Sequence, residues 1–160
     1  MTFVITGLPR SRTAWFAALF NALGHPCAHE AIKGANSLRI LEDKLKHTGN
    51  SDSGIVLLKK QFSVPTVIIH RPLADVLSSL QDTGSRQADL LNKMSIESNK
   101  LVGLHVEYKD IDTKIQSIIK HCTGAYGNAN VVELFSTLNV QRTNHVYQIT
   151  DWAISLVKEF

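Results

Sequence analysis

A chain of 160 residues, 44% hydrophobic and 19% charged, is long enough for one globular domain over 1–160 and has no low-complexity segment. Its formal net charge of +3 is too small to indicate nucleic-acid binding, and no aromatic residues are interleaved with the basic ones to stack bases. No apolar run is long enough to cross a bilayer, and no secretory signal accompanies Cys27 and Cys122, so we expect reduced thiols, no membrane partner and a cytoplasmic location.

Strand and helix signals then alternate along the chain, as short apolar runs and as apolar stripes at a spacing of three or four residues. The expected elements, in chain order, are a strand at 2–6, helices at 13–23 and 37–46, a loop at 49–54, strands at 55–58 and 66–69, a helix from Pro72 to about Gln81, a helix at 86–102, a strand at 104–108, and helices at 111–124, 129–138 and 151–160. The long helix is expected to bury Leu90, Leu91, Met94, Leu101 and Val102. This alternation predicts an α/β fold in which helices cover both faces of a parallel sheet.

The segment Gly7–Trp15 (GLPRSRTAW) joins the first expected strand to the first expected helix. Backbone N–H groups and the positive end of the helix dipole converge at such a turn, and Arg10 and Arg12 add full charges. The hydroxyls of Ser11 and Thr13 add hydrogen-bonding groups. The turn therefore predicts a site for a phosphate or sulfate group, and it suggests a nucleotide-type ligand.

A second basic segment, His70–Ser79 (HRPLADVLSS), follows a later strand. Arg71 is expected at the carboxyl end of that strand, where open α/β sheets bind ligands. On the next helix, Ser79 is expected on the more polar side, about 40° from Asp75. Because both basic turns would then lie on one edge of the sheet, Arg71 and Ser79 are expected to bind a second anionic group of the same ligand.

Three segments together resemble the sulfotransferase family. Pro9–Trp15 (PRSRTAW) resembles its phosphosulfate-binding loop, and Arg71–Ser79 (RPLADVLSS) is similar to its second signature, with the interval from Arg to Ser kept. Val106–Ile111 (VEYKDI) resembles the later strand end of the family, and the three segments occur in the family's order. The resemblance covers residues 3 to about 124 and implies a three-layer sandwich like that of the P-loop NTPases.

The resemblance also implies a donor, 3′-phosphoadenosine 5′-phosphosulfate (PAPS), from which a sulfuryl group passes to an acceptor hydroxyl or amine by in-line displacement. No metal is required by this design, and the chain lacks the Gly-Lys-(Ser/Thr) ending of an NTP-binding P-loop. The partners implied are the nucleotide donor and an unidentified acceptor. The donor-binding residues implied are Pro9, Arg10, Ser11, Arg12, Thr13, Ala14, Arg71, Ser79 and, from a possible substitute for a C-terminal donor loop, Arg142.

The catalytic residues implied by the resemblance are Arg10, Glu30 and His29. Arg10 occupies the position of the Lys or Arg that stabilises charge on the leaving phosphate. A general base must also deprotonate the acceptor. Glu30, in a segment similar to one in tyrosylprotein sulfotransferases, is the first choice, with His29 second and His70 a further rival. Glu30 could equally be a structural carboxylate that pairs with Arg10 or Arg12.

Arg12 is a departure from the family, because a glycine usually stands at its position in the loop. The backbone at Arg12 is therefore expected to avoid conformations that only glycine adopts cheaply. Trp15 and Tyr108 are expected in the core rather than in contact with a ligand. Two other functions remain open: a non-catalytic nucleotide-binding or assembly protein of this fold, and a small P-loop phosphotransferase.

Overall fold

The computed structural model describes residues 1–33, 35, 37–58, 61–80, 85–140 and 143–157. In this part of the chain, five parallel strands form one sheet in the order β2-β3-β1-β4-β5. The strands are β1 (Val4–Gly7), β2 (Cys27–His29), β3 (Gly49–Ser51), β4 (Thr66–His70) and β5 (Leu104–Glu107). The prediction of an α/β fold with a parallel sheet is confirmed.

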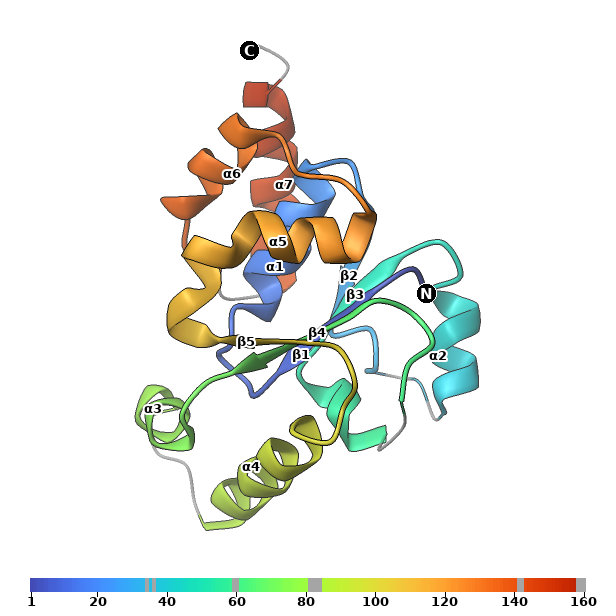
Figure 1. The fold of residues 1–160 in the computed structure, drawn as a ribbon, viewed down its shortest axis with the longest axis vertical. Coiled ribbons are helices and arrows are strands. Elements are labelled where there is room, and N and C mark those ends of the chain that lie inside the picture. Colours follow the sequence, from blue (N-terminus) through green and yellow to red (C-terminus); the bar gives the residue numbers. More distant parts are fainter. Residues whose placement is uncertain (34, 36, 59–60, 81–84, 141–142, 158–160) are drawn as a thin grey trace.

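Helices cover both faces of this sheet, which gives three layers (Figure 1). One face carries α1 (Thr13–Ala22), α5 (Ile111–Thr123), α6 (Ala129–Ser136) and α7 (Thr143–Val157). The other carries α2 (Leu38–Lys44), α3 (Leu73–Ser79), α4 (Ser85–Ser98) and the 3₁₀ turn η1 (Gly54–Leu58). A second 3₁₀ turn, η2 (Tyr108–Asp110), leads from β5 into α5.

The central strands are buried on both sides because successive side chains point to opposite faces. Ile5 and Ile69 pack in the core beneath α1 and α5, whereas Val4 and Ile68 pack in the cores on the other face. Each of these four side chains is at most 1% exposed. The uninterrupted apolar runs at 3–5 and 67–69 therefore reflect strands with no solvent-facing side.

One strand prediction and one loop prediction are wrong. Residues 55–58 form the 3₁₀ turn η1 instead of a strand, and residues 49–51, expected in a loop, form β3. Although its residues are turn formers, β3 lies between β1 and β2, and the N–H of Asn50 donates to the Phe3 carbonyl oxygen at 3.0 Å. Strand β2 was not predicted at all. Pairing with neighbouring strands, rather than local composition, makes these two segments extended.

All of the predicted helices form, and the ends of two of them differ clearly from the predicted ends. Helix α4 stops at Ser98 rather than 102, and Leu90 and Val102 are 45% and 75% exposed, contrary to their expected burial. Helix α7 begins at Thr143, eight residues before the predicted start, because Val146 and Ala153 together pack in the core under α1. The expected helix ends at Gln81 and at 160 lie outside the described residues.

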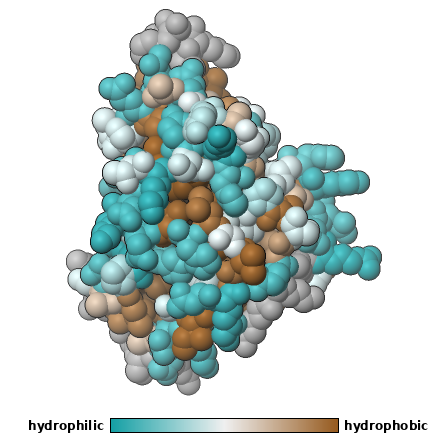
Figure 2. All heavy atoms as spheres, in the orientation of Figure 1, coloured by the Kyte–Doolittle hydropathy of each residue, from teal (hydrophilic) through white to brown (hydrophobic). Residues whose placement is uncertain are grey.

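The surface carries apolar residues as separate patches among hydrophilic ones on the face drawn in Figure 2. Exposed large apolar side chains are distributed over several elements: Ile40, Leu57, Leu90, Ile96, Val102, Tyr126, Tyr147 and Trp152. Within the residues described, every helix is too short or too polar to traverse a bilayer. Both cysteines are free and buried, and burial raises the pKa of the Cys122 thiol to about 12.

Candidate anion-binding site

The candidate site lies where the chain changes direction across the sheet. Strands β1 and β4 are neighbours, but the connection after β1 leads toward β2 at one edge and the connection after β4 leads to β5 at the other. Between two such strands the flanking helices diverge, and ligands of open α/β sheets bind in the crevice at their carboxyl ends. The two basic turns predicted to bind anions follow these two strands, so both open into this crevice.

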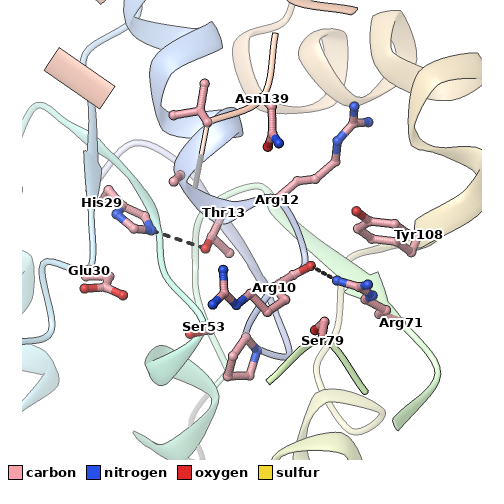
Figure 3. A pocket seen from close by; sticks show the side chains of 13 residues that line it. Arg10, Arg12, Thr13, His29, Glu30, Ser53, Arg71, Ser79, Tyr108 and Asn139 are labelled. Carbon is pink, nitrogen blue, oxygen red and sulfur yellow. Dashed lines mark hydrogen bonds between the residues drawn. The ribbon is translucent and has the colours of Figure 1, made fainter. Parts of the chain in front are cut away.

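A pocket of about 620 Å³ occupies the crevice (Figure 3). Its lining comprises Pro9, Arg10, Arg12, Thr13, Ala14, His29, Glu30, Ser53, Arg71, Ser79, Tyr108, Asn139 and Val140. The turns after all five strands contribute to it. Nine residues singled out in the sequence are therefore brought together, including Arg10 and Arg71 from turns about 60 residues apart.

The turn after β1 has an unusual backbone. Arg10 and Arg12 both adopt left-handed conformations, with φ of 65° and 64°. The expectation that Arg12 avoids a glycine-like conformation is wrong: the turn keeps that shape and places an arginine in it. A non-glycine residue pays about 1–2 kcal/mol for it. Such turns can direct successive N–H groups toward one point and form concave anion sites, and strained residues of this kind cluster at functional sites in proteins.

Gly7 allows this turn to approach β4. A Cβ atom built on Gly7 would lie 2.5 Å from the carbonyl oxygen of Ile69 and 3.3 Å from the Cβ of Ser11. Any other residue at position 7 would push the turn away from β4. The glycine therefore sets the short separation between the two basic turns.

The first turn of α1 is open to an anion. No side chain caps this helix, and the first helical bond runs from the N–H of Phe16 to the Arg12 carbonyl oxygen. The preceding N–H groups and the helix dipole thus face the pocket end of α1. Ser11 does not line the pocket but lies fully buried beneath the turn, where its Oγ has no hydrogen-bond partner among the described residues.

The guanidinium of Arg12 is held by other parts of the protein. It forms an ion pair with Asp112 of α5 at 2.6 Å and lies over the ring of Trp15 at 4.4 Å. Trp15 is itself fixed in the core, as expected, by a 2.9 Å hydrogen bond from its indole N–H to the Phe135 carbonyl oxygen. Arg12 consequently points away from Arg10 in Figure 3. Arg10, in contrast, is exposed and has no ion-pair partner in the described part of the chain.

Arg71 links the two turns. Its Nη1 donates to the carbonyl oxygen of Arg10, and its guanidinium lies 4.5 Å from the centre of the Tyr108 ring. Its Nε is buried and lacks a hydrogen-bond partner among the described residues. Ser79, whose hydroxyl donates to the Val76 carbonyl oxygen at 2.9 Å, lines the same side of the pocket. Tyr108 packs against the core as expected but also lines the pocket, a role that its sequence context did not indicate.

The opposite wall carries His29, Glu30 and Ser53 from the turns after β2 and β3 (Figure 3). Nε2 of His29 lies 3.3 Å from the Thr13 hydroxyl, and burial lowers the pKa of His29, so its imidazole is neutral at pH 7. The carboxylate of Glu30 pairs with Lys33 rather than with Arg10 or Arg12. Glu30 also has a positive φ, 53°, so all three left-handed non-glycine residues described line this pocket.

Asp52 stabilises the backbone of this wall through hydrogen bonds. The residue is 1% exposed, and its carboxylate accepts hydrogen bonds from the N–H groups of Ile32 at 3.0 Å and Gly54 at 2.8 Å. Burial raises the pKa of Asp52 above its ordinary value, while the two backbone donors partly offset that effect. Asp52 therefore holds the turns after β2 and β3 together instead of facing a ligand.

Several predicted residues lie elsewhere. His70 does not line the pocket; its Nε2 lies 2.7 Å from Nδ1 of His105, and the two rings stack. Because His70 lies outside the pocket, it is no longer a candidate for the general base. Arg142 lies outside the described residues, although Asn139 and Val140, just before it, line the pocket. Ser53 was missed because its segment was read as a loop with no chemistry.

Among the described residues, no group of three or more His, Cys, Asp or Glu side chains is arranged to hold a metal ion. Comparison with known proteins finds no family model, curated protein or solved structure that matches this chain. The site must therefore be interpreted from its own geometry and charge.

Proposed function

We propose that the protein binds PAPS in this pocket and transfers its sulfuryl group to an acceptor hydroxyl or amine. One observation carries the proposal. The turn after β1 and the turn after β4 open into one pocket, where Arg10 and the uncapped start of α1 lie beside Arg71 and Ser79. Two cationic sites in one pocket suit a ligand with two separated anionic groups.

The residues present fit such a donor. The first turn of α1, with Arg10 and Thr13, would hold the 5′-phosphosulfate, as the loop of a P-loop-like fold does. Arg71 and Ser79 would hold the 3′-phosphate. The unpartnered Nε of Arg71, a residue that lines the pocket, supports this assignment, because buried polar groups normally have partners and an anion would supply one.

When bound, the donor supplies a sulfuryl group attached to a phosphate leaving group. The guanidinium of Arg10 and the N–H groups at the start of α1 then stabilise the negative charge that develops on that phosphate. A base on the opposite wall takes the proton of the acceptor O–H or N–H. Glu30 is the first choice for this base, and the neutral imidazole of His29 is the second.

Calorimetry tests the proposal with three ligands: adenosine 3′,5′-bisphosphate, adenosine 5′-phosphate and ATP with Mg²⁺. We expect the bisphosphate to bind most tightly, without a metal. Arg71→Ala should weaken the bisphosphate about 10- to 100-fold, the value of a charge-assisted hydrogen bond, and weaken the 5′-monophosphate much less. Equal weakening of both nucleotides would contradict the role given to Arg71.

The same titrations separate the other two functions. Preference for ATP with Mg²⁺ would indicate a phosphotransferase. Metal-independent binding of the bisphosphate, without transfer from labelled PAPS to any acceptor in a broad panel, would indicate a non-catalytic nucleotide-binding protein.

A further inference from the structure

The pocket has two chemically different ends, and this difference follows from the strand order. The turns after β5 and β4 supply Tyr108 and Arg71, the turn after β1 supplies Arg10, and the turns after β3 and β2 supply Ser53 and Glu30. Three strand spacings separate β4 from β2, or about 14 Å. Figure 3 shows Arg71 and Tyr108 on one side, Glu30 on the other and Arg10 between them.

At the β2 and β3 end, the lining side chains are His29, Glu30 and Ser53, which are all polar and can form hydrogen bonds. The carboxylate of Glu30 is one-third exposed; Lys33 binds Oε2, and in the described part of the chain Oε1 has no donor. Ser53 can donate or accept. Burial keeps His29 neutral by lowering its pKa, so its ring offers one donor and one acceptor. This end therefore offers both hydrogen-bond donors and acceptors, and Lys33 balances the charge of Glu30.

We propose that the acceptor bound at this end is a hydroxyl-rich polar molecule, a carbohydrate or polyol. The inference rests on the proposed function, since it assumes that the cationic end holds the nucleotide. A flat aromatic alcohol would remove water from Glu30 and Ser53 without forming hydrogen bonds to both of them. The free-energy cost of desolvating these polar groups would exceed the gain from the apolar contact. Several hydroxyls on one molecule can bind Oε1 of Glu30 and the hydroxyl of Ser53 together.

Ligand-observed NMR tests this inference with three probes: glucosamine, myo-inositol and 2-naphthol. Each is added to the full chain saturated with adenosine 3′,5′-bisphosphate. We expect saturation transfer to glucosamine or myo-inositol and none to 2-naphthol. Glu30→Gln and Ser53→Ala should each weaken the bound sugar or polyol about tenfold, the value of one hydrogen bond to a charged or neutral partner at such a site.

Matched controls separate this end of the pocket from the rest of the molecule. Glu42→Gln, on the exposed face of α2, should leave the affinity for glucosamine unchanged. In Ser53→Ala the calorimetric affinity for the bisphosphate should stay within twofold of wild type, which shows that the variant is folded.

The possible results distinguish the two proposals. Failure of the bisphosphate to bind overturns the proposed function and, with it, this inference. Tight binding of the bisphosphate together with binding of 2-naphthol, or with no binding of either glucosamine or myo-inositol, overturns the inference alone. Binding of glucosamine that Glu30→Gln and Ser53→Ala leave unchanged also overturns it.

Discussion

The two ends of the pocket are built by different means. At the β4 and β5 end, the guanidinium of Arg71 lies over the ring of Tyr108, both residues line the pocket, and neither has a positive φ. At the β2 and β3 end, Glu30 is held in a left-handed conformation, and buried Asp52 supports the turns on either side of it. Left-handed non-glycine residues therefore occur at the end to which we assign the chemistry and at the turn between the ends, but not at the end to which we assign the 3′-phosphate.

The largest expected effect concerns the strained end. Glu30→Gln should lower the rate of transfer from labelled PAPS to glucosamine by about 10²- to 10⁴-fold, because it removes the base and keeps the shape of the side chain. Affinity for adenosine 3′,5′-bisphosphate, held at the other end, should change by less than twofold. If Glu30→Gln retains turnover and His29→Asn loses it, the base is His29 instead.

The next effect concerns the close approach of the turn after β1 to the turn after β4. Gly7→Ala should lower the free energy of unfolding by about 1–3 kcal/mol, because the new methyl group meets the Ile69 carbonyl oxygen at 2.5 Å. It should also weaken the bisphosphate, since it displaces the turn after β1 from the turn after β4. Urea denaturation and calorimetry measure the two quantities.

Gly24 is the matched control for Gly7. It has a φ of 83°, and a Cβ built there meets no atom within 4 Å. Gly24→Ala should therefore cost about 1–2 kcal/mol of stability from backbone strain alone, with unchanged affinity for the bisphosphate. Loss of affinity in both variants would show that the β1–β4 approach is not what couples the two turns.

A smaller effect concerns Arg12, which lies between the ends. The exposed ion pair with Asp112 contributes roughly 0.2–1 kcal/mol and the contact with Trp15 roughly 0.5–1 kcal/mol, close to the cost of the left-handed backbone. Arg12→Gly should thus be about as stable as wild type, and Arg12→Ala should be about 1 kcal/mol less stable than Arg12→Gly. If Arg12→Ala weakens the bisphosphate as much as Arg71→Ala does, Arg12 binds the ligand directly.

The smallest effect is a dependence of stability on pH. Burial lowers the pKa of His29 at one end and of His70, just before Arg71, below the ordinary value of 6.5. As pH falls below 6.5, the unfolded imidazoles take protons before the native ones, so stability should decrease. Urea midpoints at pH 7.5 and 5.5 measure this decrease, and His70→Asn should reduce it. A midpoint that rises on acidification would contradict the burial of both rings.

Much of the fold and part of the site could be predicted from local patterns. The spacing of apolar residues predicted β1, β4, β5 and most helices, because the residues that these elements bury in the core form a recognisable pattern within each element. The pattern PRSRTAW and the Arg71–Ser79 interval located both basic turns. Strands β2 and β3 could not be found this way, because Gly49, Asn50 and Ser51 become a strand only by pairing with neighbours on both sides. Ser53 was missed with them, although His29 and Glu30 of the same wall were singled out in the sequence.

The amino-acid sequence alone determined which residues could bind an anion, since charge, hydroxyl groups and position after a strand are local properties. Only the tertiary structure decided how each is used. Arg12 looks equivalent to Arg10 in the sequence, but its guanidinium forms an ion pair with Asp112, 100 residues further along the chain. Arg10 and Arg71 instead line one pocket, because β1 and β4 are neighbours in the sheet. The physical reason is that partners distant in the chain set the direction of a long flexible side chain, and the identity of a residue does not specify those partners.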